Sequence, residues 1–317
     1  MAKEINCAVI IPFFGRFEQL TLCVLALLDQ SHKKFKIVLI DDGSNSKYSS
    51  SSYVTKLPKD ERLIFLEHDK NHGVAKARNT GVKWCKSNSI DLILMIDSDC
   101  LPSSNFVSGH ITLHERHPSA SCIGGGMVSV GESVWAKLDN ILSWVHSIPE
   151  GEVRSISPLY HLPTTNFSIK ISEVPDREEL FDNRLQTGED ALLIKKLIKR
   201  GKSVLFSPVP KVKHYDRNTL SDVLHHHYKW GYHQYFIQLG GNISSRCFKL
   251  WYRVLFASCF FFSIPLYALL GSCLNLLPWL KYRPSYIIYA PLIYIVWLFK
   301  ACAILEAAIS PNTVLRT

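Results

Sequence analysis

Apolar residues follow two different patterns along the chain. Over residues 1–217, short β-branched runs alternate with stretches whose apolar positions repeat at helical spacing. Such alternation is typical of a mostly parallel α/β sheet with helices on both faces, and ligands bind these sheets at the carboxyl ends of the strands. A Ser-rich surface turn is expected at 44–52. The pattern predicts, in order, strand 7–12, helix 17–30, strand 35–40, strand 63–67, helix 74–87, strand 91–96 and helix 191–200.

The last third of the chain is far more apolar. Residues 254–280 contain no Lys, Arg, Asp, Glu or His, and about 20 apolar residues suffice to cross a bilayer. A second uncharged run, 284–299, continues past Lys300 to residue 309. We expect a C-terminal region, 250–317, with a hydrophobic helical hairpin in the membrane, either as two full spans or as a shallow re-entrant pair. A buried helical subdomain is the alternative.

Residues 218–249 separate these two regions. They contain apolar and aromatic residues at helical spacing together with three consecutive histidines at 225–227. This composition predicts an amphipathic helix at the membrane interface. The sequence therefore predicts three parts, a globular domain over 1–217, an interfacial helix over 218–249 and membrane helices over 250–317.

Charge and cysteine content refine this picture. The 317 residues are 47% hydrophobic and 20% charged, which excludes a disordered chain. Of the net charge of +9, a net +6 lies from residue 246 onward, beside the apolar runs, which favours anionic lipid over nucleic acid as the partner. Nine cysteines without a CxxC pair favour reduced cytosolic thiols over disulfides or zinc. No signal peptide is expected, because the apolar run 7–14 is too short.

Two acidic turns follow predicted strands. Asp41-Asp42-Gly43-Ser44 comes directly after strand 35–40, and Asp97-Ser98-Asp99 comes directly after strand 91–96. A carboxylate in the first turn could accept hydrogen bonds from a base or ribose, and the second pair could chelate a hard divalent cation. Each turn alone could be an ordinary strand-end turn. Because both end neighbouring strands, we expect them to face one crevice.

Two further segments carry candidate chemistry. In 71–81, Gly73 could open a helix whose amides point at an anion, with Lys76 and Arg78 near a phosphate; a solvated basic helix is the alternative. Gly188-Glu189-Asp190 precedes an amphipathic helical run. A carboxylate there is either a helix cap or a general base.

These segments together resemble a known family. The order 9–14, 41–44, 71–81, 97–99 and 188–190 is similar to that of family-2 inverting glycosyltransferases of the GT-A fold, of the membrane-anchored type found in bacterial polysaccharide biosynthesis. The resemblance covers about residues 5–217. No single motif is specific, but five in the right order are. The implied fold is a Rossmann-like mixed, mostly parallel sheet flanked by helices.

The resemblance implies roles for the donor side of a site. Asp99 would bind Mg²⁺ or Mn²⁺, and Asp97 would contact the ribose or the metal shell. His214 would lie near the metal or the diphosphate, with a structural histidine as the alternative. Asp42 would be the better candidate for contact with the base. The nucleoside pocket as a whole would be lined by Pro12, Phe13, Asp41, Asp42 and Arg78.

It also implies an acceptor side. Asp190 would be the general base, since an inverting displacement needs one base for the acceptor hydroxyl and one cation for the leaving diphosphate. Processive members carry Gln-x-x-Arg-Trp on an interfacial helix, whereas His226-His227-Tyr228-Lys229-Trp230 keeps only the tryptophan. Transfer of a single sugar is therefore favoured over secretion of a polymer. The donor sugar and the acceptor would be contacted by Gly125, Asn166, Glu189 and Trp230.

The implied reaction moves one sugar from a nucleotide diphosphate, with a UDP-sugar favoured, to a hydroxyl of a membrane-associated glycan or a lipid-linked acceptor. The catalytic region would lie in the cytoplasm, at the inner or plasma membrane. Two alternatives remain at this point. One is a non-catalytic assembly protein that binds sugar nucleotides. The other is a sugar nucleotidyltransferase, which would need a Gly-rich basic loop after the first strand, where residues 12–16 contain one glycine.

Overall fold

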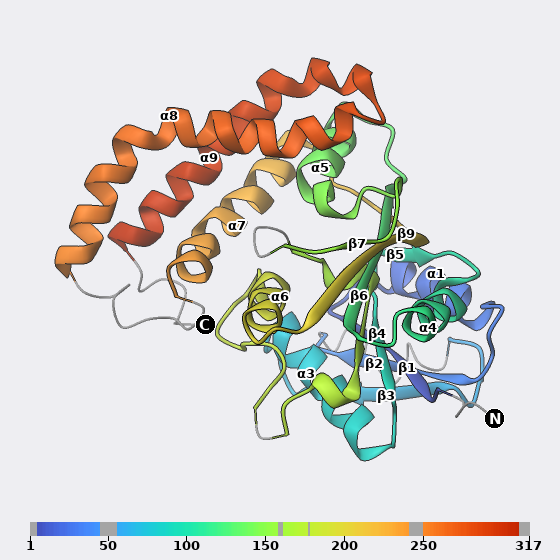
Figure 1. Ribbon diagram of the computed structural model, residues 1–317. Coiled ribbons are helices and arrows are strands. Elements are labelled where there is room, and N and C mark those ends of the chain that lie inside the picture. The colour runs from blue at the N-terminus through green and yellow to red at the C-terminus, as the bar shows by residue number, and fades with distance from the viewer. Residues whose placement is uncertain (1–4, 45–55, 158–160, 177, 241–249, 311–317) are drawn as a thin grey trace. The chain divides into compact units, whose positions relative to one another are not determined.

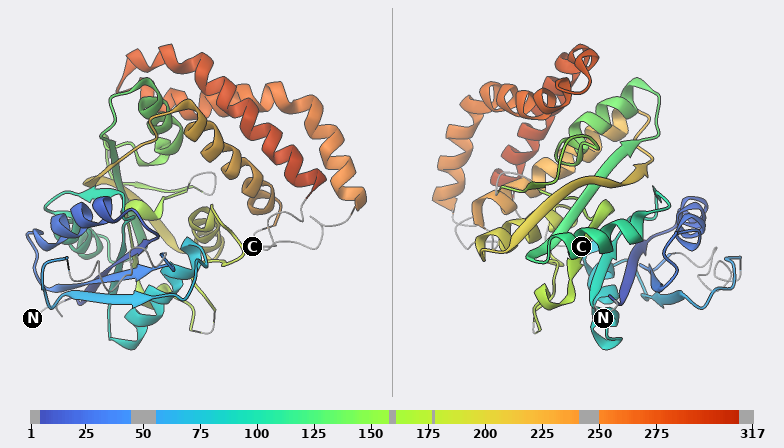
Figure 2. Two further views of the ribbon diagram at one scale, coloured as in Figure 1. Left: turned by 180° about the vertical axis from the view of Figure 1, so that it is seen from behind. Right: turned by 45° about the vertical axis from the view of Figure 1, so that its right-hand side comes forward.

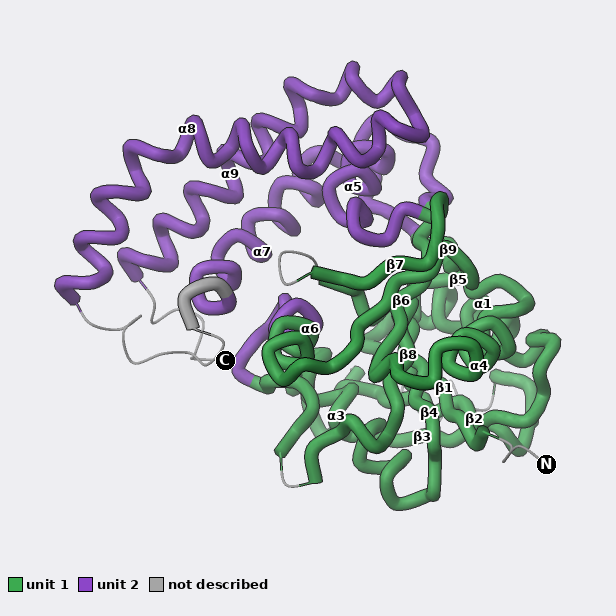
Figure 3. Tube along the Cα trace, in the orientation of Figure 1, with its two compact units in different colours: residues 1–128, 149–183, 193–214 green, residues 129–148, 184–192, 215–317 purple. Residues whose placement is uncertain are grey.

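The computed structural model describes residues 5–44, 56–157, 161–176, 178–240 and 250–310 (Figure 1). Most of the predicted turn at 44–52 lies outside these residues. The chain forms two compact units, coloured separately in Figure 3. The first comprises residues 1–128, 149–183 and 193–214, and the second comprises 129–148, 184–192 and 215–317.

The first unit is built on a parallel half-sheet. Its strands run in the order β3-β2-β1-β4, and every adjacent pair is parallel. Continuous apolar runs form these strands because both sheet faces are covered, and β1 is buried along its whole length. The strands are β1 (Cys7–Phe13), β2 (Phe35–Asp41), β3 (Leu63–Glu67) and β4 (Leu92–Met95).

Helices of the first unit cover this sheet. Those predicted at 17–30 and 74–87 are confirmed as α1 (Phe17–Leu28) and α3 (Val74–Ser87). Ala77 and Val82 of α3 join Ile10 of β1 in one buried core. A helix that the sequence pattern did not predict, α4 (Phe106–Arg116), precedes the later strands.

The sheet continues beyond β4 with strands of mixed direction. The order is β4-β8-β6-β9-β5, with β7 paired to β9. The pairs β4/β8, β6/β8, β5/β9 and β7/β9 are antiparallel. The predicted mixed α/β sheet is thus confirmed, with its parallel part over the N-terminal strands. The added strands are β5 (Cys100–Pro102), β6 (Ala120–Ser129), β7 (Arg154–Ser155), β8 (Phe167–Lys170) and β9 (Ser203–His214), with 3₁₀ turns η3 (Thr164–Asn166) and η4 (Ile171–Glu173) beside β8.

The second unit is helical. It contains α5 (Val134–Ser143), η2 (Val145–Ser147), α7 (Leu220–Gly240), α8 (Leu250–Leu280), η6 (Pro284–Tyr289) and α9 (Ala290–Ile309). Aromatic residues of α7 and small residues of α9 share a buried cluster, and Phe256 and Phe260 of α8 pack against it. The predicted hydrophobic hairpin is thus confirmed as a helical structure. Helix α6 (Glu189–Lys199) begins in the second unit and continues into the first.

Two segments are long and apolar enough to cross a membrane. They are Leu250–Leu280 and Pro284–Ile309, each with a mean hydropathy of 2.0. Only 11% of the most apolar stretch in the first is buried, compared with 39% in the second. The first segment therefore exposes most of its apolar surface.

Candidate active site

The nucleoside side of the predicted site begins at the end of β2. Asp41 is the last residue of this strand and is fully buried. Its Oδ1 accepts hydrogen bonds from the backbone N–H of Ser44 at 2.9 Å and from the Ser44 hydroxyl at 2.6 Å. The same hydroxyl oxygen accepts a bond from the N–H of Gly15 at 2.8 Å. This relay joins the turn after β2 to the loop after β1.

Asp42, the next residue, is bonded to the start of α3. Its Oδ1 accepts a bond from the N–H of His72 at 3.0 Å, and its Oδ2 accepts one from the N–H of Gly73 at 2.7 Å. The ring Nδ1 of His68 lies 2.7 Å from Oδ1. The carboxylate thus binds the free amides at a helix N-terminus. Its predicted contact with a nucleoside base stays a prediction.

Gly43 makes this arrangement possible. Its φ is +75°, and a Cβ there would lie 2.2 Å from the carbonyl carbon of Lys70. Any other residue would be strained and would collide with the backbone that leads to His72 and Gly73. The Asp-Gly turn of the sequence is therefore a close approach of two loops, which brings Asp42 to α3.

Three other predicted nucleoside residues lie beside these. Pro12 and Phe13 are buried at the end of β1 and pair in register with Ile40 and Asp41 of β2. Arg78 on α3 is 3% exposed, and its Nη2 donates to Asp97 Oδ1 at 2.7 Å. The structure thus brings Arg78 and Asp97 together as a buried cation that orients the first carboxylate of the Asp97-Ser98-Asp99 turn.

The second carboxylate, Asp99, meets His214. Residue Cys100 starts β5, and it pairs in register with His214 at the end of β9. Donor atoms of Asp99, Cys100 and His214 all lie within 4.8 Å of one another, and Asp99 Oδ1 lies 3.8 Å from His214 Nε2. Asp97 is outside this group, with Oδ1 bonded to Arg78. The three side chains surround a candidate metal centre, for which Asp99 and His214 are the candidate ligands.

The donor types fit a divalent cation such as Mn²⁺. A carboxylate oxygen suits Mg²⁺ and Mn²⁺, and an imidazole nitrogen favours the transition metal of the two. Burial, followed by the charges of Asp99 and Asp97, raises the pKa of the Cys100 thiol. The thiol donates to Asp99 Oδ1 at 3.9 Å. Cys100 therefore orients the carboxylate.

Two residues of this centre could not be predicted from the sequence, Arg16 and Cys100. The Nη1 of Arg16 lies 2.9 Å from Asp99 Oδ2. Gly15 and Arg16 both adopt left-handed backbone conformations, with φ of +61° and +52°, which turn the chain directly after β1. A glycine beside an arginine at a strand end is the only sequence signal for this contact. Cys100 was likewise missed, because its role depends on the β5–β9 register.

Gly125 and Asn166, which were predicted to contact sugar, are packed against each other. Asn166 is fully buried, and its Nδ2 donates to the carbonyls of Gly126 at 2.9 Å and Pro210 at 3.0 Å. A Cβ on Gly125 would lie 2.2 Å from that nitrogen. The small residue at 125 thus makes room for Asn166, which holds β6 and β9 together. Contact of either residue with a sugar stays a prediction.

A buried polar relay extends from Asn166. His110 Nε2 lies 2.9 Å from Asn166 Oδ1, and its Nδ1 lies 2.9 Å from the hydroxyl of Ser168. His114 Nε2 lies 2.9 Å from the same hydroxyl. Burial lowers the pKa of His110 to about 4 and that of His114 to about 3. Both rings are therefore neutral at pH 7 and serve as structural hydrogen-bonding groups.

The predicted base Asp190 and two of the predicted acceptor residues, Glu189 and Trp230, belong to the second unit. Glu189 is buried and Asp190 is half-buried on the first turn of α6, where Asp190 Oδ1 accepts from the N–H of Ala191 at 2.7 Å. A Cβ on Gly188 would lie 2.4 Å from Ile237 Cδ1, so this turn packs against α7. Trp230, on the same helix α7, lies with its ring 4.4 Å from that of His226.

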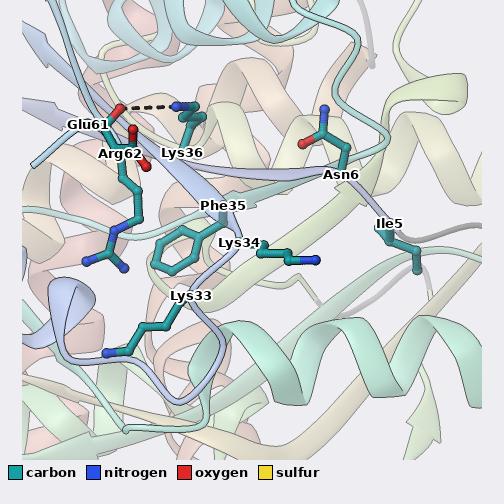
Figure 4. A pocket seen from close by; sticks show the side chains of 8 residues that line it. All are labelled: Ile5, Asn6, Lys33, Lys34, Phe35, Lys36, Glu61 and Arg62. Atoms are coloured by element: carbon teal, nitrogen blue, oxygen red, sulfur yellow. Dashed lines mark hydrogen bonds between the residues drawn. The ribbon is translucent and has the colours of Figure 1, made fainter.

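A separate pocket lies at the opposite, amino-terminal ends of the strands (Figure 4). It sits where β1 and β2 begin, whereas the candidate metal centre follows the carboxyl ends of the strands. None of the predicted site residues lines it. The lining residues are Ile5, Asn6, Lys33, Lys34, Phe35, Lys36, Glu61 and Arg62.

The fold and the acidic turns define the class to which this chain belongs. A solved structure of GalNAc-T7 with UDP, GalNAc and Mn²⁺ superimposes with a TM-score of 0.55 at 16% identity, over 76% of this chain and 53% of that one. The sheet is therefore of the GT-A type. The sequence model of the family described as glycosyl transferase family 2 matches residues 8–171, which is more than half of the chain. The chain belongs to this family.

Curated relatives agree with the family. An uncharacterized glycosyltransferase of Rickettsia conorii is 29% identical over 213 residues, which cover 61% of this chain and 31% of the relative. A protein named pre-mycofactocin glycosyltransferase, from Mycobacterium tuberculosis, is 26% identical over 220 residues, which cover 68% of this chain and 44% of the relative. The chain thus spans less than half the length of these relatives.

Proposed function

We propose that this chain is a metal-dependent inverting glycosyltransferase. It moves one sugar from a nucleotide diphosphate donor, with a UDP-sugar favoured, to a hydroxyl of a membrane-associated glycan or a lipid-linked acceptor. The observation that carries the proposal is the convergence of Asp99 and His214, next to the Arg78–Asp97 pair, after the carboxyl ends of the strands. A role in polysaccharide biosynthesis is part of the same proposal.

The donor is bound by the first unit. Asp99 and His214 would hold Mn²⁺ or Mg²⁺, which stabilises the negative charge on the departing diphosphate when it is bound. Arg78, buried against Asp97, fixes the carboxylate beside the cation so that it can accept hydrogen bonds from the ribose. Pro12, Phe13 and Asp41 line the nucleoside pocket, and Asp42 contacts the base.

The acceptor is activated by the second unit. Asp190 accepts the proton of the acceptor hydroxyl while that oxygen attacks the anomeric carbon. The bond between this carbon and the donor phosphate oxygen breaks, and its electron pair leaves with the nucleoside diphosphate. One base is sufficient because the displacement is a single step with inversion. Glu189 and Trp230 contact the sugar and the acceptor.

The acceptor is delivered by the membrane. Asp190 and Trp230 lie in the same compact unit as the two apolar helices α8 and α9. Six of nine net positive charges accompany these helices, and such charges favour anionic lipid headgroups. Nucleotide sugars are cytosolic, so the first unit faces the cytoplasm and the second unit rests on the inner or plasma membrane.

A donor-cleavage assay tests the donor half of the proposal. Full-length protein in detergent with Mn²⁺ is incubated with UDP-, GDP- and dTDP-sugars, and the released nucleoside diphosphate is measured. We expect release from one donor, lost with EDTA and in Asp99→Asn. Asp176→Asn, at a fully exposed carboxylate, is the matched control. Equal release by Asp99→Asn and the control would contradict the metal role of Asp99.

A second variant tests the base. Labelled sugar is offered together with membrane lipid extract, and the label that enters the organic phase is measured. Asp190→Asn should abolish this transfer while its affinity for UDP and Mn²⁺ stays within about twofold of the wild type. Undiminished transfer by Asp190→Asn would remove Asp190 as the base and leave the donor half of the proposal standing.

A further inference from the structure

We propose that α8 and α9 lie flat in one leaflet of the membrane, with the exposed face of α8 in lipid, and do not cross the bilayer. This inference rests on the membrane association in the proposed function and specifies its geometry. The position of the two helices within the second unit carries it. The contacts of both helices with α5 and α7 are internal to that unit.

An apolar face runs along α8. Phe262 is 84% exposed, Leu274 is 68% exposed and Leu277 is 62% exposed, although each side chain would gain about 1.5–3 kcal/mol by leaving water. At one end of α8, Lys281 and Arg283 provide cations beside aromatic rings. Aromatic and cationic residues next to an apolar surface match the headgroup region of a bilayer. Lipid is therefore the occupant of this face.

The C-terminal end of α8 is held by α5. Asn275 Nδ2 donates to the carbonyl of Leu142 at 3.2 Å, and the indole Nε1 of Trp279 donates to the carbonyl of Ile141 at 3.1 Å. Helix α5 begins at Val134, five residues after β6 ends at Ser129. Five residues span at most about 18 Å, and the eight residues from Val134 to Leu142 add about 12 Å along the helix. Even a straight path from β6 to this contact would therefore not exceed the hydrocarbon core of about 30 Å. This end of α8 is therefore on the same side of the membrane as the sheet.

The opposite end of the hairpin is held by α7. The hydroxyl of Tyr232 donates to the carbonyl of Ser310 at 2.6 Å, and the hydroxyl of Tyr228 donates to Glu306. Helix α7 begins six residues after β9 ends. Tyr228 directly follows His227, whose ring lies against Asp139 of α5, so this end of the hairpin is on the same side of the membrane as α5.

The two supporting helices are bonded to each other. His227 Nε2 of α7 lies 3.3 Å from Oδ1 of the fully buried Asp139 of α5. Arg217, just before α7, donates to Asp139 Oδ2 at 3.0 Å through Nη1. Because α5 and α7 are joined through these buried polar groups, the two ends of the hairpin that they bind share one side of the membrane.

The middle of α9 also faces this layer. The Lys300 ammonium lies 4.5 Å from the Trp297 ring and 6.0 Å from the Trp230 ring of α7. A Cβ on Gly231 of α7 would lie 2.4 Å from the Lys300 carbonyl oxygen. In a transmembrane α9 this lysine would be near the bilayer centre, where a charge is costly. In the flat arrangement it is packed against α7.

The topology follows from these three contacts. A hairpin that crosses a bilayer has its closed and open ends on opposite surfaces. Here the end near Asn275, the middle near Lys300 and the end near Tyr232 all contact the same layer of helices. The hairpin therefore lies parallel to the membrane surface. Figures 1 and 2 show α8 and α9 running beside α7 and α5 within this unit.

Sided cysteine labelling tests the topology. Lys281→Cys, between the two helices, is made in full-length protein whose Cys247, Cys259, Cys273 and Cys302 are changed to Ser. Lys83→Cys, on the exposed face of α3, is the matched control. Both proteins are reconstituted in sealed vesicles of anionic and zwitterionic phospholipid. A PEG-maleimide that cannot cross bilayers is added before or after detergent.

The flat arrangement predicts equal labelling of the two positions before detergent, whatever the orientation of the protein. A hairpin that crosses the bilayer predicts that position 281 is protected in the fraction of molecules whose position 83 is accessible, so the two labelled fractions would add up to the whole. This result would overturn the flat arrangement and leave the membrane association standing. Ser285→Cys, also exposed, repeats the measurement at a second site. Failure of the wild type to float with vesicles would overturn the membrane association itself, while nucleoside diphosphate release would still report on catalysis.

Discussion

The ion pair between Arg16 and Asp99 leads to a quantitative prediction about metal binding. Arg16 Nη1 lies 2.9 Å from Asp99 Oδ2, so a guanidinium occupies one oxygen of the candidate metal ligand. A cation bound by Asp99 and His214 competes with this guanidinium for negative charge. We predict that Arg16→Gln binds Mn²⁺ more tightly than the wild type in the absence of donor.

The size of the effect follows from the exposure of the pair. The side chain of Arg16 is 66% exposed and that of Asp99 is 18% exposed. Ion pairs of this kind contribute about 0.2–1 kcal/mol, so their removal should tighten Mn²⁺ binding about 1.4- to 5-fold. The screening length falls from about 10 Å at 0.1 M salt to about 3 Å at 1 M. The difference between variant and wild type should therefore shrink at high salt.

Electron paramagnetic resonance of free Mn²⁺ during titration measures this affinity without any turnover. Arg116→Gln, at an exposed arginine on the last turn of α4, is the control and should bind as the wild type does. Unchanged or weaker binding by Arg16→Gln would refute the reasoning. The same would follow from a gain that persists undiminished at 1 M salt.

Three further predictions concern stability. Burial holds the pKa of His110 at about 4, so the folded state disfavours protonation of this ring. The contribution of neutral His110 to the free energy of unfolding is fully present above the ordinary pKa of 6.5 and is lost as the pH falls toward 4. This one group should cost about 2 kcal/mol between pH 7.5 and 5, and urea unfolding should show a smaller pH dependence in His110→Gln. Gly125→Ala forces a methyl group onto Asn166 and should lower stability by about 1–3 kcal/mol, measured by thermal unfolding. Arg253→Ala removes donors to the carbonyls of Ala308 and Ile309 and should expose the end of α9 to faster amide hydrogen exchange.

The parallel strands could be predicted because their signal is local. The run predicted as strand 7–12 is β1, and the helix predicted at 74–87 is α3 with the same bounds. Both sheet faces are covered, so the apolar run is continuous and its limits are sharp. Strand β9 was not predicted, because it contains Pro208 and Pro210, which favour edge or irregular structure in a sequence. Its pairing with β5 and β7 depends on residues far away in the chain.

The candidate site also contains features that could be predicted from the sequence and features that could not. Resemblance to a family placed His214 near a metal, and the strand register brings it to Asp99. Arg16 could not be found from spacing, because its contact requires two successive left-handed residues after β1. Gly125 and Asn166 were predicted to contact sugar, and their steric and hydrogen-bonding demands on each other are visible only once β6, η3 and β9 are packed.

Helix α6 contains residues of both compact units. Its first turn carries Asp190 and belongs to the helical unit, whereas Leu193, Ile194 and Leu197 on the following turns are buried in the core of the sheet unit. The helix predicted at 191–200 is therefore confirmed, and its apolar positions are the ones buried in that core. Within the helical unit, α7 packs against the turn before Asp190 and also supports α9. The candidate base and the hydrophobic hairpin are thus linked by contacts inside one unit, whereas the candidate donor-nucleotide and metal residues belong to the other.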